Sequence, residues 1–551
     1  MDSAGRWLGS VAAVPAGFFA KQVHRLATGH RAVVEVRVAP LDDASSRSAF
    51  LHRFRRIAVD DDISGVLLRI DGPPGGWAAT FDLRAAIEAL KASGKRVHAH
   101  LTHPGNAAIA LASACDRVFV APLEELGLVG IGTELTFFGS ALERLGIEPD
   151  FEAAGAYKSF GEPFTRTFAS AENQEAVGAL VGDLNAQLIT AIASGRRIPE
   201  ERVAALLLEA PIPATRARDA GLVDEVLYPD EVEKWVLDHH GDGAHLVSFR
   251  AWAARDRGLQ WIDRWGDGSP GVAVLHLDGP IVLDDHGPSV LIRARRVGPV
   301  LEAVRKDKRV AAVVLHVNSP GGSALASDLL WREVQRLAAE KPVIASFEDV
   351  SASGGYYLSA PAAEIVARPS TLTGSIGVFG GKLVVGEGLR KLGVFTQPVV
   401  AAPNATLFSP NHRFTEGQRV RFRASLQRFY DGFVERVAAG RHRPPDQIEP
   451  HCRGRVWTGQ AALERGLIDR TGDLAVAVER ARVRAGLTDY RVLTWSSRRH
   501  GLMARLLGGA VRRIRPIGAE VVEGILPSPS MAVVLRCPGE PLVLLPWSLT
   551  G

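Results

Sequence analysis

The sequence predicts an α/β protein built as a tandem duplication of one domain. Short apolar runs such as GVLLRI and AAVVLHV alternate with amphipathic stretches such as SDLLWREVQRLAAE, a pattern typical of buried parallel strands alternating with helices. The run VLLRIDGPPGGWAATFDLRAAIEAL, which begins at Val66, has a counterpart in VVLHVNSPGGSALASDLLWREVQRL, which begins at Val313. Similar segments recur at a spacing of about 246 residues over roughly 150 residues of each half.

Length and composition agree with two large domains and exclude several classes of protein. The 551 residues exceed one ordinary core, and 46% hydrophobic residues are ample for packed interiors. A net charge of +4 is too small for a nucleic-acid-binding surface, so no nucleic-acid partner is expected. The cysteines (Cys115, Cys452 and Cys537) lie far apart, which excludes a disulfide framework and a CxxC zinc site.

The repeat divides the chain into four expected parts. Residues 31–265 form the first repeat and residues 266–490 the second, with an N-terminal apolar segment (1–30) before them and a tail (491–551) after them. The apolar run RWLGSVAAVPAGFFA is shorter than the about 20 residues that span a bilayer. It therefore fits a packed or interfacial helix, a signal or an anchor. The tail segment SSRRHGLMARLLGGAVRRIRP predicts a basic amphipathic helix, either on a membrane surface or in solvent.

Ser353 is a candidate nucleophile in the second repeat. It lies in DVSASGGYYLSAPA, after the predicted strand PVIASF, where small neighbours permit a sharp turn that exposes its hydroxyl at a helix N-terminus. Serine is also a common helix N-cap, so a structural role is the alternative. One strand earlier, the amides of Gly321 and Gly322 in SPGG suit a substrate carbonyl oxygen, although a tight turn alone also explains these glycines.

Lys158 is the candidate base. An activated serine needs a base, and no histidine near Ser353 shows the pattern of a catalytic triad. Lys158 lies in FEAAGAYKSFGEPFTR, where the small residues of AAGA permit close approach of another part of the chain. Burial there would lower the pKa of its amine. The alternative is a solvated loop lysine.

The duplication itself supports a shared site. At the repeat spacing, Ser353 corresponds to Asn106 of the first repeat, and Lys158 corresponds to Ala405 of the second. Each repeat therefore lacks the candidate group that the other supplies. One composite site follows, and it requires the lysine amine to lie about 2.6–3.2 Å from the serine hydroxyl.

The combination of SPGG, SASGGYYLSAPA and PSTLTGSIGV in the second repeat with AYKSFGEPFTR in the first resembles the signal peptide peptidase A (protease IV) family of serine peptidases, in its long duplicated form. The similarity covers residues 34–487. It implies a βαβ spiral domain related to crotonase and Clp protease. It also implies that Ser353 is the nucleophile, that Lys158 is the general base, and that Ser375 positions the lysine amine.

The resemblance further implies that the amides of Gly354, Gly321 and Gly322 form an oxyanion hole, and that neither a cofactor nor a metal is needed. The expected activity is hydrolysis of signal-peptide remnants or other hydrophobic peptides through an acyl-enzyme. The expected protein is a homo-oligomer, a tetramer by this resemblance, that associates with a membrane surface or is anchored in it. The expected location is the bacterial inner membrane, facing outward, with a cytoplasmic location left open.

Two other functions stay open from the sequence. A crotonase-like enzyme acting on acyl-coenzyme A would use the glycine pairs to stabilise an enolate, but the exchanged serine and lysine positions argue against it. An inactive scaffolding relative is disfavoured by the presence of both Ser353 and Lys158. The run HAHLTH (His98, His100 and His103) makes a metal pair conceivable, but no completing ligand stands nearby, and surface histidines are expected.

Overall fold

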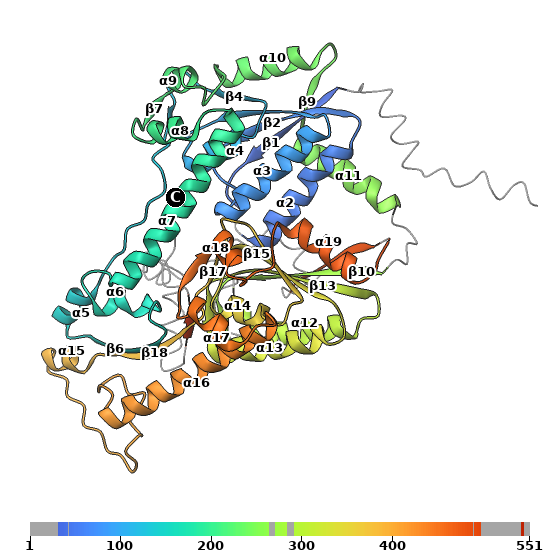
Figure 1. The fold of residues 1–551 in the computed structure, drawn as a ribbon. Helices are drawn as coiled ribbons and strands as arrows, with labels where there is room; N and C mark the ends of the chain where they lie inside the picture. Colours follow the sequence, from blue (N-terminus) through green and yellow to red (C-terminus); the bar gives the residue numbers. More distant parts are fainter. Residues whose placement is uncertain are drawn as a thin grey trace, which may run out of the picture. The chain divides into compact units, whose positions relative to one another are not determined.

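The computed structural model describes residues 31–41, 43–263, 270–283, 291–488, 490–496 and 542–544 (Figure 1). The apolar segment 1–30 and the amphipathic helix expected over 496–516 lie almost entirely outside the described residues. The chain divides into two compact units. Unit 1 consists of Met1–Ile131 and Asn185–Gly268, and unit 2 consists of Gly132–Leu184 and Ser269–Thr550.

These units are a different division from the sequence repeats. Residues 132–184 belong to the first repeat by sequence but to unit 2 by their contacts. The boundary between the units falls inside helix α7 (Ala171–Arg196). The four-part division at residues 30, 265 and 490 stays a prediction.

Unit 1 is built on a parallel sheet of six strands in the order β8-β4-β3-β2-β1-β9. Apolar side chains cover both of its faces, because Leu68 packs in the larger core and Leu67 packs with Val232 and Val236 of α10. This explains why the predicted strand GVLLRI is continuously apolar. The elements of unit 1 are β1 (Ala32–Val38), α2 (Ala44–Arg56), η1 (Ile57–Val59), β2 (Ile63–Ile70), α3 (Trp77–Ala92), β3 (Arg96–Leu101), α4 (Asn106–Ala112), β4 (Arg117–Val120), β5 (Glu125–Leu126), α8 (Glu200–Leu207), β7 (Ile212–Pro213), α9 (Ala214–Asp219), β8 (Glu225–Val226), α10 (Pro229–His240), β9 (His245–Ser248) and α11 (Phe249–Asp263).

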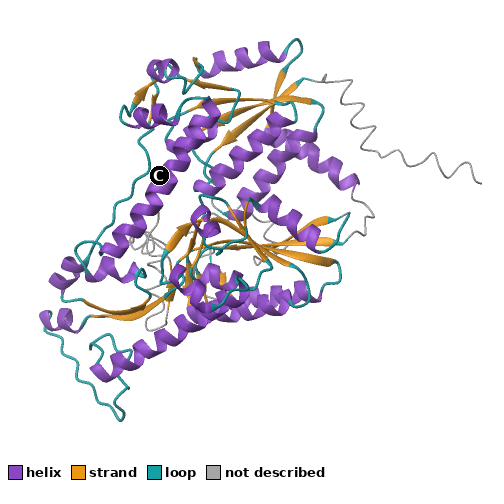
Figure 2. Ribbon diagram, in the orientation of Figure 1, coloured by secondary structure: helices purple, strands orange, loops and turns teal. Residues whose placement is uncertain are grey.

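Unit 2 contains two sheets. The larger has eight strands along the path β19-β17-β15-β13-β10-β21, with β16 and β20 beside it, and the second has the order β12-β11-β14-β22-β18-β6. Helix α19 covers one face of the larger sheet, and α12 and α13 cover the other (Figures 1 and 2).

The elements of unit 2 are α5 (Gly139–Leu145), β6 (Glu148–Ala154), η2 (Ser159–Gly161), α6 (Glu162–Thr165), β10 (Gly271–Asp278), β11 (Ile281–Val282), β12 (Ile292–Arg293), α12 (Ala294–Lys306), β13 (Val310–Ser319), β14 (Gly321–Ser323), α13 (Ala324–Ala338), β15 (Val343–Ala352), α14 (Gly354–Ser359), β16 (Glu364–Ala367), β17 (Leu372–Gly374), β18 (Val378–Val384), α15 (Gly386–Lys391), α16 (Glu416–Gly440), α17 (Pro445–Ile448), η3 (Glu449–His451), β19 (Val456–Thr458), α18 (Gly459–Glu464), β20 (Arg470–Thr471), α19 (Leu474–Arg484), β21 (Arg491–Ser496) and β22 (Leu542–Leu544).

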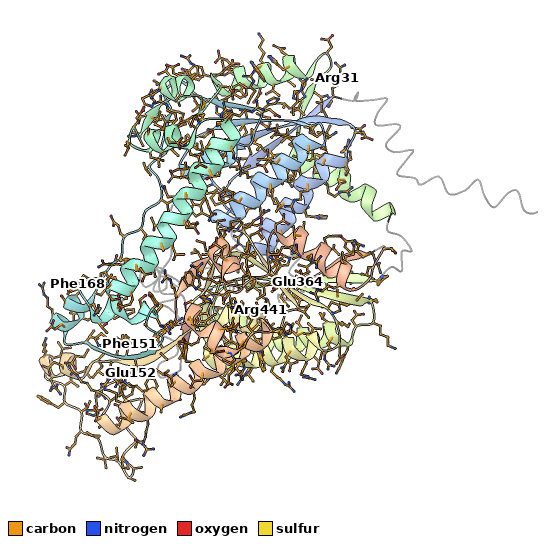
Figure 3. The ribbon with its side chains drawn as sticks, viewed as in Figure 1. Arg31, Phe151, Glu152, Phe168, Glu364 and Arg441 are labelled. Atoms are coloured by element: carbon orange, nitrogen blue, oxygen red, sulfur yellow. The ribbon has the colours of Figure 1, made fainter. Side chains whose placement is uncertain are left out.

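Strand β6 carries a piece of the first repeat into unit 2. It pairs antiparallel with β18 over its whole length, from Glu148 opposite Val384 to Ala154 opposite Val378. On α16, the Arg419 guanidinium donates to the carboxylates of Asp150 and Glu152 at 2.7 and 2.6 Å. Figure 3 labels Glu152 on β6. Both carboxylates are nearly buried, so these ion pairs hold the strand firmly. The chain that leaves β6 leads directly to Lys158.

Candidate active site

Ser353 occupies a strained turn between β15 and α14. Its φ of 54° and ψ of −115° are a conformation that residues with side chains rarely adopt. The turn needs Gly355, since a Cβ there would lie 3.0 Å from the Ser319 carbonyl oxygen. The Ser353 N–H donates to the Gly374 carbonyl at 2.7 Å, but its side chain makes no capping bond to α14. The N-cap alternative therefore does not describe this serine.

The hydroxyl of Ser353 faces Lys158. The Lys158 Nζ lies 3.0 Å from the Ser353 Oγ, 2.9 Å from the Ser375 Oγ and 3.1 Å from the Ser375 carbonyl oxygen. All three residues are buried, and Ser353 has no exposed surface. The sequence predicted an exposed hydroxyl, and that prediction is wrong, because the lysine and the surrounding strands enclose it.

Burial also sets the protonation of the lysine. Desolvation lowers the pKa of the Lys158 ammonium well below its ordinary value, because a buried site disfavours the charged form. A lysine with a lowered pKa offers its lone pair at a lower pH than a solvated lysine does. Both groups lie in unit 2, since the lysine arrives with β6 and the serine with β15.

Ser375 holds the amine from the other side. It follows β17 in a left-handed conformation with φ of 50°, and its N–H donates to the Arg455 carbonyl at 2.7 Å. This fixed backbone aims both its hydroxyl and its carbonyl oxygen at the Lys158 Nζ. The lone pair of the amine is thereby left to point toward Ser353.

A turn at Arg453 and Gly454 supports the lysine backbone. The Tyr157 N–H donates to the Arg453 carbonyl at 2.8 Å, and the Gly454 N–H donates to the Ile376 carbonyl at 2.7 Å. Gly454 has a φ of +79°, and a Cβ on it would lie 2.7 Å from the Cβ of Lys158. This turn was not predicted from the sequence. Its contact joins residues far apart in sequence, and the arginine–glycine pair carries no other signal.

The Gly321–Gly322 turn lies beside the serine turn, because Gly355 contacts Ser319. The Gly321 N–H donates to the Ser319 Oγ at 3.2 Å. A Cβ on Gly322 would lie 1.9 Å from the Ile281 carbonyl oxygen, so only glycine fits there. The turn thus serves the fold, and it also brings backbone amides next to the serine.

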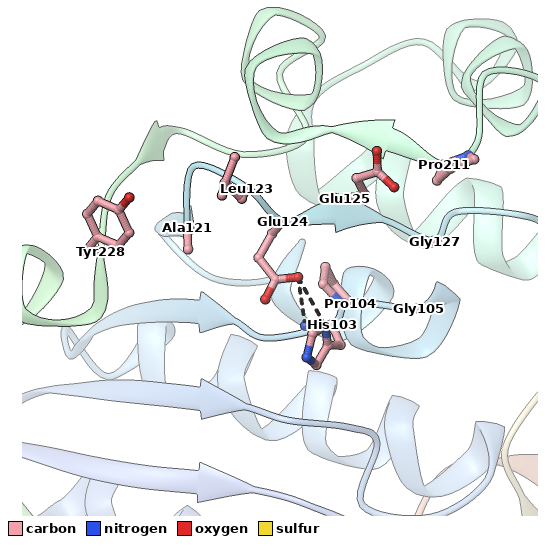
Figure 4. A pocket seen from close by; sticks show the side chains of 10 residues that line it. All are labelled: His103, Pro104, Gly105, Ala121, Leu123, Glu124, Glu125, Gly127, Pro211 and Tyr228. Carbon is pink, nitrogen blue, oxygen red and sulfur yellow. Dashed lines mark hydrogen bonds and ion pairs between the residues drawn. The ribbon is translucent and has the colours of Figure 1, made fainter.

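The first repeat has no nucleophile at the matching corner. Asn106 begins α4, and its side-chain amide exchanges two hydrogen bonds with Gly130, at 2.7 and 3.1 Å. An open pocket of about 680 Å³ lies next to it, between His103, Glu124, Leu123 and Tyr228 (Figure 4). His103 and Glu124 form an ion pair at 3.4 Å whose histidine is largely exposed. Asn106 here is a structural residue.

Two of the three histidines of HAHLTH are buried, so the expectation of surface histidines is wrong for His98 and His100. The His98 Nε2 lies 3.1 Å from the Nε2 of His240, whose Nδ1 lies 2.8 Å from the Ser64 Oγ. Burial lowers the pKa of His98 and of His240 to about 4, so both rings are neutral at neutral pH. Within the described ranges, no group of three or more histidine, cysteine, aspartate or glutamate side chains is placed to hold a metal ion.

Comparisons with known proteins place these residues in context. The model of peptidase family S49 matches residues 89–241 and again 335–488. Serine protease SPPA, chloroplastic, from Arabidopsis thaliana is 31% identical over 452 residues, which are 79% of this chain and 65% of that protein. Protease 4 from Salmonella typhi is 29% identical over 504 residues, 89% of this chain and 81% of that protein. Among solved structures, a ClpP1 mutant from Listeria monocytogenes matches 37% of this chain and 94% of its own, with 13% identity and a TM-score of 0.25.

The family matches, together with a buried lysine–serine pair, define a serine peptidase. More particularly, the chain belongs to peptidase family S49, whose model covers more than half of it. The two matched segments lie at the same spacing as the sequence repeat. This confirms the predicted tandem duplication of an α/β domain and the resemblance to the signal peptide peptidase A family.

Proposed function

We propose that this chain is an endopeptidase in which Ser353 is the nucleophile and Lys158 is the general base. The observation that carries the proposal is the distance of 3.0 Å between the Lys158 Nζ and the Ser353 Oγ in a buried site. That distance is within reach for direct proton transfer. The lowered pKa of Lys158 supports the same role, because only the neutral amine accepts a proton.

The proposed reaction proceeds through an acyl-enzyme. Neutral Lys158 takes the proton of the Ser353 hydroxyl as the Oγ bonds to the scissile carbonyl carbon. The resulting ammonium then donates that proton to the leaving amine as the C–N bond breaks. A water activated by the same amine attacks the ester and releases the acyl half. Ser375 acts as a positioning residue, because it accepts the other hydrogens of the lysine amine.

The oxyanion of the tetrahedral intermediate is assigned to backbone amides. Gly354 directly follows the nucleophile, and the Gly321–Gly322 turn lies next to it. Amides in a water-excluded site stabilise such a charge strongly, and one donor is worth about 3–4 kcal/mol. The Gly321 N–H is bonded to the Ser319 Oγ, so it has to leave that bond to serve as a donor.

We propose that the substrates are hydrophobic peptides, among them the remnants of signal peptides. We further propose that the chain forms a homo-oligomer, a tetramer by family resemblance, and that this oligomer associates with a membrane. The inner membrane of a bacterial cell, with the site facing outward, is the proposed location. Of the described helices, α7 is long and apolar enough to cross a bilayer. Its Leu188 and Ile192 are buried in the core of unit 1, which favours a core helix. An anchor, if present, is therefore sought in residues 1–30.

The test is hydrolysis of a hydrophobic peptide ester by the purified full chain, alongside acyl-coenzyme A substrates. Ser353→Ala is expected to lower kcat by at least about 10³-fold and to abolish labelling by a serine-reactive fluorophosphonate. Ser351→Ala is the matched control, since this buried hydroxyl has no hydrogen-bond partner among the described residues, and it should keep activity. Turnover of acyl-coenzyme A alone would favour the crotonase-like alternative. A folded chain that shows neither hydrolysis nor fluorophosphonate labelling, also in the tail variants described below, would favour the scaffolding relative.

A further inference from the structure

A short strand from the C-terminal tail lies inside the second sheet of unit 2. Strand β22 pairs antiparallel with β14, with Leu542 opposite Ser323, Val543 opposite Gly322 and Leu544 opposite Gly321. On its other side, Leu542 is opposite Phe379 of β18. The strand therefore has a neighbour on both edges, and it closes the gap between β14 and β18.

Both neighbours of β22 belong to the surroundings of the dyad. On one side is the Gly321–Gly322 turn, which the proposed function assigns to the oxyanion. On the other side, the Phe379 ring stacks on Phe160 at 4.4 Å between centroids, two residues beyond Lys158. The backbone of β22 thus runs between the oxyanion side and the lysine side of the site.

An extended peptide binds a sheet by adding a strand, with main-chain hydrogen bonds for affinity and side-chain pockets for specificity. A peptide substrate that adds as a strand to the edge of β14 at Gly322 would take the place that Val543 and Leu544 occupy. Ser353 has no exposed surface in this arrangement. The tail segment is also chemically similar to the proposed substrates, because PLVLLPW is apolar throughout.

We propose that Leu542–Leu544 is an intramolecular inhibitor that occupies, as an added strand, the place of a hydrophobic peptide substrate. This inference rests on the proposed function, and it names the regulation of the same site. The peptidase is closed while the tail is paired with β14 and β18, and it opens when the tail leaves. A peptide substrate competes with the tail strand for the backbone groups of β14 and β18. A partner that binds the tail favours the open state.

The experiment compares Val543→Pro with Val543→Ala in the full chain. Proline removes the N–H of the central residue of β22, which lies between two strands, and proline is poorly tolerated inside a sheet. Alanine keeps that N–H and most of the strand. We expect Val543→Pro to raise kcat/KM for a hydrophobic peptide ester at least fivefold, and Val543→Ala to stay within twofold of the wild type. A synthetic peptide PLVLLPW should inhibit Val543→Pro competitively at about millimolar concentration, the effective concentration of a tethered segment.

A second arm locks the strand in place. Leu542→Cys with Phe379→Cys joins two opposed residues, in a Cys537→Ser background that removes the other tail thiol. The oxidised protein should lose at least nine tenths of its activity, and reduction should restore it. The reduced protein is the internal control, and this arm stands even if Val543→Pro fails to fold.

The outcomes separate the two proposals. Equal Ser353-dependent hydrolysis by the wild type and Val543→Pro, or full activity of the oxidised double-cysteine protein, overturns the inhibitor and leaves the peptidase intact. No Ser353-dependent hydrolysis or fluorophosphonate labelling in the wild type, in Val543→Pro or in the reduced protein overturns the peptidase itself.

Discussion

Replacing Lys158 by methionine is expected to abolish hydrolysis and, at the same time, to stabilise the fold at neutral pH. Methionine keeps most of the volume of the lysine stem but has no amine to accept the proton of Ser353. Burial lowers the pKa of Lys158 well below its ordinary value, whereas a lysine of the unfolded chain titrates near 10.4. Folding at neutral pH therefore makes Lys158 release a proton, and this release disfavours folding.

The free energy of that release depends on the pH and on the pKa of the unfolded lysine. At about 1.4 kcal/mol per pH unit below 10.4, it is at most about 4–5 kcal/mol at pH 7 and at most about 2 kcal/mol at pH 9. The variant also loses three hydrogen bonds, one to Ser353 and two to Ser375, at about 1 kcal/mol each. We expect Lys158→Met to be more stable than the wild type by up to about 1–2 kcal/mol at pH 7, and less stable than it by about 1 kcal/mol at pH 9.

The direction of the pH dependence follows from proton binding. Between the lowered pKa of Lys158 and about 10.4, the unfolded chain binds more protons than the fold, so the contribution of Lys158 makes the wild type more stable as pH rises. The hydrolysis rate also rises with pH through the lowered pKa, because the base has to be neutral. Other titrating groups cancel when the two proteins are compared at one pH.

The assay is urea denaturation of both proteins at pH 7 and pH 9, with ester hydrolysis followed from pH 5 to pH 10. Lys158→Met should hydrolyse the ester at least about 10³-fold more slowly. Lys382→Met is the matched control, because this buried lysine of unit 2 donates to the Leu407 carbonyl at 2.9 Å, away from the dyad, and its variant should retain activity. A wild type that is more stable than Lys158→Met at both pH values, or a variant with normal hydrolysis, would refute the reasoning.

Two further predictions concern the backbone that carries the lysine. Gly454→Ala should lower kcat by about 10²-fold, because its Cβ would push against Lys158. Gly393 has a matching φ of +78° and open space around it, so Gly393→Ala should cost about 1–2 kcal/mol of stability and leave kcat unchanged. Equal kinetics for the two variants would contradict the positioning role of Gly454. Asp150→Ala should destabilise unit 2 by about 2–3 kcal/mol, since it removes the acceptor of the Phe414 N–H and one of the two carboxylates that Arg419 binds. Glu148→Ala removes a more exposed pair on the same strand and should change stability by at most about 1 kcal/mol in thermal unfolding. Similar losses for the two variants would show that burial does not set the strength of these pairs.

The candidate pair Ser353 and Lys158 could be predicted from the sequence because the motifs around them resemble those of a known family, and the duplication supports the pairing. Asn106 opposite Ser353 and Ala405 opposite Lys158 show that each repeat lacks one partner. The strands also follow from local pattern, since GVLLRI and AAVVLHV fall within β2 and β13. Buried parallel strands are apolar on both faces, and this leaves a strong signal in sequence.

The route by which the lysine reaches the serine could not be predicted. The pairing of β6 with β18 joins a strand that mixes polar and apolar residues to a strand that contains two glycines. An antiparallel pair of this kind has no local signature in the sequence. The support from Gly454 and the position of β22 are equally non-local, since each depends on a partner far away in the chain. The burial of His98 could not be predicted, because strand alternation does not show that helix α10 places His240 next to it.

The placement of residues 132–184 in unit 2 has a consequence for biosynthesis. The amine is translated 195 residues before the hydroxyl, and the sheet that receives its strand is completed by still later segments. A growing chain on the ribosome thus carries the lysine for a long part of its synthesis before it carries the serine. The proposed dyad therefore forms only after Ser353 and the strands that surround it have been synthesised, so a shorter nascent chain has no base beside a nucleophile.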